Sequence, residues 1–262
     1  MTVPYKSTLS AGQGMIPESR ILLELWQPSM DGKELHRAAL ASGRFATVSA
    51  KRLSNMVIDV FTPRFLTCER PPVAWLKDVQ DQLSARELAQ IMFLYAARDN
   101  LVLADFVRQV YWPAYAAGRD TISNEDARRF VERANLEGKP RQPWSDTVVT
   151  RMARYLTGAC ADFALLENGR ANERRILPFR IEPRVAAILA YDLHFEGLGD
   201  NRVLAHEDWL LFGLEREDVL AEFKRLALRG LFIIQAAGEV VKIHWPYKSM
   251  DEVLHVLTQG EF

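Results

Sequence analysis

The sequence predicts a mainly α-helical protein, a helical bundle that contains winged helix-turn-helix-like units. Apolar residues recur at three- and four-residue spacing through most of the chain, which is the period of an amphipathic helix. Capping residues precede several of these segments, and glycine and proline separate them. Residues 163–179 and 231–245 instead combine β-rich runs with central turn residues, which is typical of hairpins.

Local start signals support the expected helices. Pro17 suits the first position of a helix, where its missing N–H is not needed. Serine N-caps followed by an acidic residue open three others: Ser84 with Glu87, Ser123 with Asp126, and Ser145 with Asp146. In chain order, the expected helices are residues 17–26, 33–41, 49–61, 85–97, 101–116, 124–134, 146–156, 183–195 and 216–228.

Each expected hairpin follows helices. The first has the turn dipeptide Asn168-Gly169 between residues 163–167 and 175–179, and the second turns at residues 236–239. Two helices and then a hairpin is the order of a winged helix-turn-helix, whose last helix can enter a DNA groove. Small winged units also serve as packing or protein-docking modules, so the order alone leaves both kinds of partner open.

Proline and glycine clusters divide the chain into three expected segments. These are an N-terminal helical, helix-turn-helix-like unit (1–70), a helical core with a winged-helix-like unit (71–196), and an acidic C-terminal winged-helix-like unit (197–262). Residues 196–262 carry 7 Lys/Arg against 12 Asp/Glu, which leaves 26 against 22 in residues 1–195. A basic face on residues 1–195 is therefore compatible with the net charge of −1.

The composition is that of a soluble globular protein. Its 262 residues are 48% hydrophobic, which suffices for a substantial core. The longest apolar runs fall far short of the roughly 18 residues of a membrane span, and the N-terminus has no secretory signal pattern. We therefore expect a cytoplasmic protein with no membrane partner.

Motifs of catalysis and of metal binding are missing from the sequence. The five histidines have no metal-ligand spacing, and there is neither a GxSxG elbow nor a D-x-D pair. We expect no enzyme activity, cofactor or metal, although a carboxylate site assembled in space remains open. The stretch from Gly12 to Gly14 lacks the Lys-Ser/Thr of a P-loop and the third glycine of a Rossmann turn, which favours a flexible lead-in with no assigned role.

The segment 146–156 carries the clearest candidate contact surface. Opposite its apolar stripe, Thr147, Thr150, Arg151 and Arg154 are expected to point outward. Arginine forks match phosphate oxygens and guanine edges, and threonines can donate to phosphates. The following hairpin adds Arg170, Arg174 and Arg175, although a solvated arginine-rich loop explains that hairpin equally well.

Two further helices differ in the charge that they expose. On residues 49–61, Lys51 and Asn55 are expected to point outward with Arg52 at the flank, which makes a plausible second DNA contact that Asp59 weakens. On residues 216–228 the expected outward residues are Glu217, Asp218 and Glu222. Acid repels phosphate, so that unit is better suited to a basic protein partner.

A series of short motifs carries a family resemblance. In order they are YKSTLSAGQG, ESRILLEL, RDNLVLADFV, SNEDARRF and WSDTVVTRM. With this order and spacing, residues 5–190 resemble the BrxA family of BREX bacteriophage-defence systems. The resemblance implies a cytoplasmic, non-enzymatic, mostly helical DNA-binding protein, similar in fold to the RNA-binding antitermination factor NusB, with other BREX proteins as partners. It transfers no catalytic residues.

The leading hypothesis is therefore a non-enzymatic accessory protein of phage defence that grips double-stranded DNA mainly through backbone phosphates. The main alternative is a scaffold that docks other defence proteins through its acidic C-terminal unit. RNA binding and a cryptic nuclease activity are further alternatives.

Overall fold

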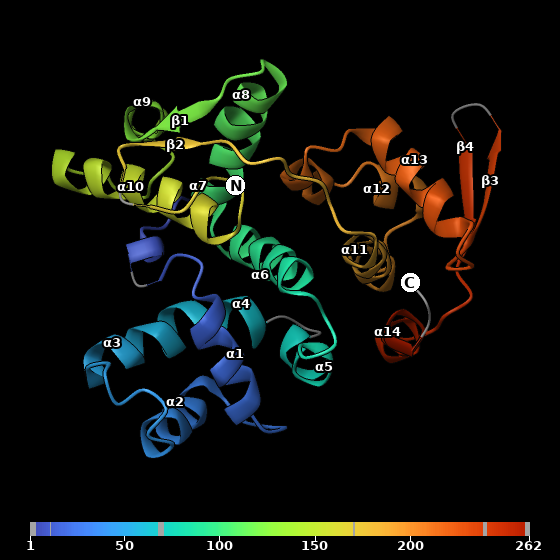
Figure 1. Cartoon of the computed structure of the whole chain (residues 1–262), viewed down its shortest axis with the longest axis horizontal. Helices are drawn as coiled ribbons and strands as arrows, with labels where there is room; N and C mark the ends of the chain where they lie inside the picture. The colour runs from blue at the N-terminus through green and yellow to red at the C-terminus, as the bar shows by residue number, and fades with distance from the viewer. Residues whose placement is uncertain (1–3, 11, 68–70, 170, 238–239, 260–262) are drawn as a thin grey trace. The chain divides into compact units, whose positions relative to one another are not determined.

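The computed structural model in Figure 1 describes residues 4–10, 12–67, 71–169, 171–237 and 240–259. It confirms a mainly helical protein. The chain forms two compact units: unit 1 comprises Met1–Gln80 and Met92–Pro178, and unit 2 comprises Asp81–Ile91 and Phe179–Phe262. This division differs from the three expected segments, because Pro72 begins a helix of unit 1 and Gly197 lies in a turn of unit 2.

All of the expected helices are present in the structure, and several others join them. Helices of unit 1 are α1 (Ile16–Leu25), α2 (Gly32–Ala41), α3 (Ala50–Ser54), α4 (Thr62–Phe65), α5 (Pro72–Val79), α7 (Leu101–Phe106), α8 (Trp112–Ala116), α9 (Asn124–Leu136) and α10 (Asp146–Asp162), with a 3-10 turn at Thr8–Ser10. Unit 2 has α11 (Pro183–Phe195), α12 (Asp200–Leu204), a 3-10 segment at Glu207–Phe212, α13 (Arg216–Ala227) and α14 (Met250–Gln259). The first turns of helix α6 (Ala85–Asp99) belong to unit 2, and the rest of this helix belongs to unit 1.

Two helices continue through a proline by way of a π-helical segment. The segment Asn55–Phe61 joins α3 to α4, and Val107–Tyr111 joins α7 to α8. Each precedes a proline, Pro63 or Pro113, which has no N–H for the usual helical hydrogen bond. The wider turns accommodate the proline ring, so the helix expected to end at Phe61 runs on to Phe65.

The serine caps have mixed outcomes. Ser123 and Asp126 form a reciprocal capping box at α9, with N···O distances of 3.0 and 2.9 Å, and Ser84 with Glu87 forms the same arrangement at α6. Ser145 stands at the N-cap of α10 but makes no side-chain capping bond, so that part of the expectation is wrong.

The first expected hairpin is only partly present. The segment around β2 (Glu173–Arg175) does pair with the chain after α10, through a bridge between Leu166 and Ile176. Its longer antiparallel pairing is with β1 (Thr121–Ser123), a strand too short to show in the sequence pattern. In unit 1, α9 and α10 pack against each other and β1 lies beside α9 (Figure 1).

The second expected hairpin is confirmed. Strand β3 (Ile233–Ala237) pairs antiparallel with β4 (Val240–His244), and Ile233 lies opposite His244. Ala236 and Ala237, which were expected in the turn, belong to β3, and residues 238–239 of the expected turn lie outside the described part of the chain. Within the described residues, no helix has both the length and the apolar composition needed to cross a membrane.

Candidate nucleic-acid interface

Helix α10 presents one exposed polar stripe. Thr147, Thr150, Arg151 and Arg154 are all exposed, at the i, i+3, i+4, i+7 positions that share one face of a helix. The opposite face is buried, and Met152 and Leu156 are at most 1% exposed. Among the residues that the structure describes, no hydrogen bond or ion pair engages the guanidinium of Arg151 or Arg154. Both cations are therefore available to an external anion.

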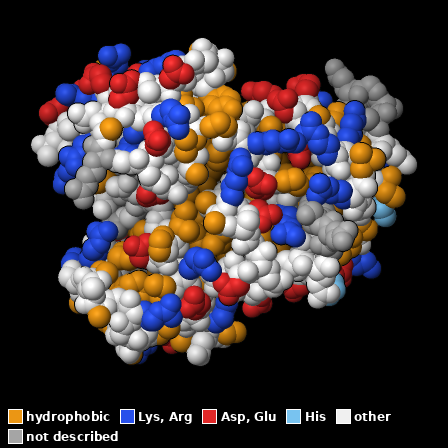
Figure 2. All heavy atoms as spheres, viewed as in Figure 1, with side chains coloured by type: hydrophobic (Ala, Val, Ile, Leu, Met, Phe, Trp, Pro, Cys, Tyr) orange, Lys and Arg blue, Asp and Glu red, His pale blue; other side chains and the backbone are white. Residues whose placement is uncertain are grey.

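Helix α9 also exposes arginines, but acidic side chains engage them. Arg128 lies 2.8 Å from Glu132 and 3.0 Å from Asp146. Arg129 lies 3.4 Å from Glu125, and the next arginine along the helix, Arg133, is 3.9 Å from Glu137. Figure 2 shows basic and acidic side chains intermixed over this helix. The charge of α9 is largely compensated locally.

The hairpin arginines do not act as one group. Arg174 and Arg175 are neighbours on β2, so their side chains leave opposite faces of the strand. Arg174 is half-buried, donates to the carbonyl of Glu167 at 3.2 Å, and lines a pocket with Arg154. Arg175 points to the other side and lies 3.7 Å from the carboxylate of Glu167. Arg170 lies outside the described residues.

The second candidate surface lies on α3 and the start of the π-helical segment. Lys51 and Arg52 are exposed, and Asn55 is half-buried rather than fully outward. Arg52 lines a pocket together with Tyr155, so the structure brings part of this surface close to α10. Asp59 is exposed on the same helix, as expected.

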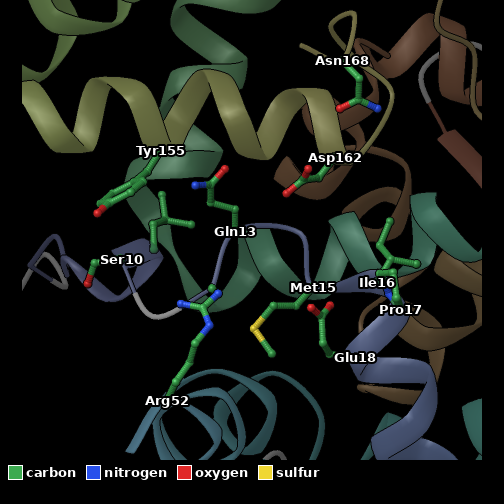
Figure 3. Close-up of a pocket in the computed structure, with 12 residues that line it drawn as sticks. Ser10, Gln13, Met15, Ile16, Pro17, Glu18, Arg52, Tyr155, Asp162 and Asn168 are labelled. Atoms are coloured by element: carbon green, nitrogen blue, oxygen red, sulfur yellow. The ribbon is translucent and has the colours of Figure 1, made fainter. Parts of the chain in front are cut away.

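Two hollows flank α10 in unit 1. The small pocket, of about 440 Å³, is lined by Gln13, Asn124, Arg154, Tyr155, Gly158, Gly169, Ala171, Asn172 and Arg174. The large pocket, of about 680 Å³, is lined by Leu9, Ser10, Gly12, Gln13, Met15, Ile16, Pro17, Glu18, Arg52, Tyr155, Asp162 and Asn168 (Figure 3). Sequence reasoning missed most of these residues, although the Gly-Gln-Gly stretch was a visible signal.

Hydrogen bonds tie the Gly12–Gly14 loop to other parts of unit 1. The buried guanidinium of Arg64 donates to the carbonyl oxygens of Gly12 at 3.2 Å, Gln13 at 3.1 Å and Gly14 at 3.5 Å. The N–H of Gly14 donates to Asp162 at 2.9 Å. The stretch is thus tied to two other parts of the chain, which the sequence did not indicate, and the Gly14 N–H is already committed to a side chain.

Glycine is required at position 14, where this loop meets α10. A Cβ on Gly14 would stand 2.4 Å from the Cβ of Asp162, which neither side can relieve. A Cβ on Gly158 would stand 2.1 Å from the side-chain oxygen of Gln13, but this oxygen is the end of a flexible side chain that can move away. Directly after the loop, Met15 adopts a left-handed backbone with φ of 52°, a costly conformation for a residue with a side chain.

Electrostatics around the loop reflect its burial. Burial lowers the pKa of Arg64 to about 10, against the opposing charge of Asp99, so Arg64 stays charged at neutral pH. Partial burial raises the pKa of the Asp162 carboxyl, while the Gly14 N–H and the charge of Arg174 oppose the rise. Full burial likewise raises the pKa of the Cys160 thiol, which is unsuited to a nucleophile.

The acidic face of α13 differs from the expectation. Glu217 and Asp218 are exposed as expected, but Glu222 is buried, 2.6 Å from Arg225 and 3.7 Å from Arg180. Glu222 is thus an internal partner of two arginines and not part of a docking surface. Among the described residues, no group of three or more His, Cys, Asp or Glu side chains could hold a metal ion.

Comparisons with known proteins agree with this fold. A solved structure of an uncharacterized protein from Magnetospirillum magneticum is similar with a TM-score of 0.58 at 18% identity, over 73% of this chain and 95% of that one. No curated protein matches the chain. The family model described as BrxA matches residues 3–192. The chain therefore belongs to the BrxA family, which indicates a component of a BREX bacteriophage-defence system.

Proposed function

We propose that this protein is a non-enzymatic, cytoplasmic DNA-binding accessory component of its defence system, which holds duplex DNA mainly by the backbone phosphates. The observation that carries the proposal is the stripe of Thr147, Thr150, Arg151 and Arg154, whose two arginines have no acidic partner among the described residues. Guanidinium forks and hydroxyl donors at helical spacing match a row of phosphate oxygens.

Neighbouring cations extend this stripe. Arg174 shares the small pocket with Arg154, and Arg52 reaches the large pocket from α3. These side chains come from three separate parts of the chain, yet all border the same hollowed side of α10. Arg175 faces away and pairs with Glu167, so we exclude it from the proposed contact.

Equilibrium DNA binding with matched double variants tests the proposal. Changing Arg151 and Arg154 to Ala should weaken binding to a 20-base-pair duplex by about tenfold or more at low salt, because two phosphate contacts are lost. Changing Arg128 and Arg129 to Ala alters the net charge equally but removes arginines that are already paired. Equal losses in the two variants would contradict the proposed site.

A scaffold role for unit 2 is the second candidate. The matched family region ends at residue 192, and beyond it Glu217 of α13 and Asp251 of α14 are exposed. Helix α13 followed by the β3–β4 hairpin is the order of a winged helix-turn-helix, here with acid on the helix. A NusB-like arrangement and RNA binding stay predictions.

Co-purification with the other defence proteins separates the scaffold from the DNA-binding role. The full chain with Glu217→Lys and Asp251→Lys should lose its partner but keep DNA affinity if unit 2 is the docking module. Truncation at residue 197 would be a poor test, because it separates α11 from the rest of unit 2. If the variant with Glu217→Lys and Asp251→Lys captures the partner as well as the native protein does, the scaffold role is contradicted.

A further inference from the structure

The two pockets beside α10 are neighbours, and together we call them the hollow. Gln13 and Tyr155 line both of them, so the small pocket and the large one adjoin at these side chains. Figure 3 shows Tyr155 and Asp162 projecting from α10 toward the loop that carries Gln13, with Arg52 reaching up from α3. Volumes of about 440 and 680 Å³ are in the range of small-molecule sites.

The small pocket suits a phosphate. Its charged lining residues are Arg154 and Arg174, and no carboxylate residue is among those described in its wall. Arg174 is held by a hydrogen bond from its Nη1 to the carbonyl of Glu167 at 3.2 Å, and its Nε is buried without a hydrogen-bond partner in the described part of the chain. Asn124 steadies the wall, because its amide donates to Asn172 at 3.4 Å and its oxygen accepts from Thr157 at 2.6 Å.

The large pocket suits a different chemistry. It adds two carboxylates, Glu18 and Asp162, to an apolar floor formed by Leu9 and Met15. Glu18 makes no hydrogen bond or ion pair with any described residue. A nucleobase has an apolar face that stacks on an aromatic ring such as Tyr155, and an edge whose amino group donates to carboxylates.

From this division of charge we propose that the hollow binds one unpaired nucleotide, with its phosphate in the small pocket and its base in the large one. The inference rests on the proposed DNA binding and names the part of the DNA that this site takes. A base inside a paired duplex is stacked and cannot enter, whereas one at a bulge, a gap or a flap can. The paired duplex lies outside the hollow, along Arg151, Arg154 and the two threonines, and Arg154 stands where this stripe meets the small pocket.

Fluorescence anisotropy with two duplexes tests the proposal. One is fully paired, and the other is identical except for a single bulged dA. The native protein should bind the bulged duplex about tenfold more tightly than the paired one. This factor is the contribution of one base stacked on an aromatic side chain. Free dAMP at millimolar concentration competes for a nucleotide site but not for a bent duplex. If the protein recognises the unpaired nucleotide, dAMP should remove the extra affinity for the bulged duplex and leave the affinity for the paired duplex unchanged.

Variants of the hollow provide the controls. Tyr155→Ala and Gln13→Ala should abolish the preference while leaving affinity for the paired duplex within about twofold, and Tyr155→Phe should retain the preference. Because Gln13 is on a loop and half-exposed, its variant tests the site even if Tyr155→Ala fails to fold. Arg151→Ala should weaken both duplexes by the same factor.

The outcomes separate this proposal from the proposed function. Equal affinity of the native protein for both duplexes, or a preference that survives in Gln13→Ala, would overturn the nucleotide site and leave duplex binding intact. Failure to bind either duplex would overturn both.

Discussion

Helices α9 and α10 pack against each other and both carry exposed arginines, yet only the arginines on α10 are open to an external ligand among the residues described. On α9, acidic residues one helical turn away engage Arg128 and Arg129. On α10, threonines occupy the equivalent neighbouring positions of Arg151 and Arg154. The difference shows that a count of arginines says little about binding until their partners are known.

The largest expected effect comes from reversing the charge of the open pair. Arg151→Glu with Arg154→Glu should lower duplex affinity about a hundredfold at low salt, because attraction to phosphate becomes repulsion. Arg128→Glu with Arg129→Glu changes the net charge equally and should cost far less. Anisotropy titrations measure both, and circular dichroism verifies the folds. Similar losses would remove the distinction between the two helices.

Arg64 offers a third kind of arginine, buried and used internally. Arg64→Met should lower the free energy of unfolding by about 2 kcal/mol, because three loop carbonyls lose their charged donor. Urea unfolding checks this value. The salt dependence of DNA binding should be unaltered, since Arg64 does not reach solvent. A change in salt dependence without a loss of stability would contradict this role.

The comparison can also be inverted by freeing the arginines of α9. Glu125→Gln with Glu132→Gln removes the acidic partners one turn away, while Asp146 still lies 3.0 Å from Arg128. The two changes should therefore raise duplex affinity about threefold, mainly through Arg129. An unchanged affinity would mean that something other than ion pairing keeps α9 off the DNA. The measurement is the same titration used for the charge reversals.

A smaller effect, on the stability of the protein, is expected when the pH is lowered and Asp126 is protonated. Partial burial by itself raises the pKa of the Asp126 carboxyl. Hydrogen bonds from Arg119 and Ser123 outweigh this effect and lower the pKa below its usual 3.8. A lowered folded-state pKa means that the stabilisation is present above about pH 4 and is lost as the pH falls through the folded value. Asp126→Asn should therefore be less stable than the native protein near pH 6, and the difference in stability should shrink as the pH falls below about 4. A gap that persists at low pH would contradict this assignment.

The sequence predicted most of the secondary structure, because helical periodicity and capping are local signals. The exposed stripe of α10 follows directly from its 3.6-residue period. The pairing on α9 was equally readable, since Glu125 and Arg129 are four residues apart, as are Arg128 and Glu132. The opposite directions of Arg174 and Arg175 would have followed from recognising β2 as a strand.

The hollow beside α10 could not be predicted from local patterns. Its walls come from the N-terminal loop, α3, α10 and the segment before β2, which are far apart in the chain. The burial of Arg64, which fixes the loop, likewise depends on long-range packing. A glycine stretch indicates that the backbone approaches something closely, and only the structure identifies α10 as that neighbour.

The salt dependence of duplex affinity tests the central claim most directly, because the slope of log K against log salt counts phosphate contacts. We expect the slope to decrease in magnitude by about 2 when Arg151 and Arg154 are changed to Ala. We expect no decrease when Arg128 and Arg129 are changed instead. A slope that is the same for the native protein and the α10 variant would contradict the claim that these two arginines hold the DNA backbone.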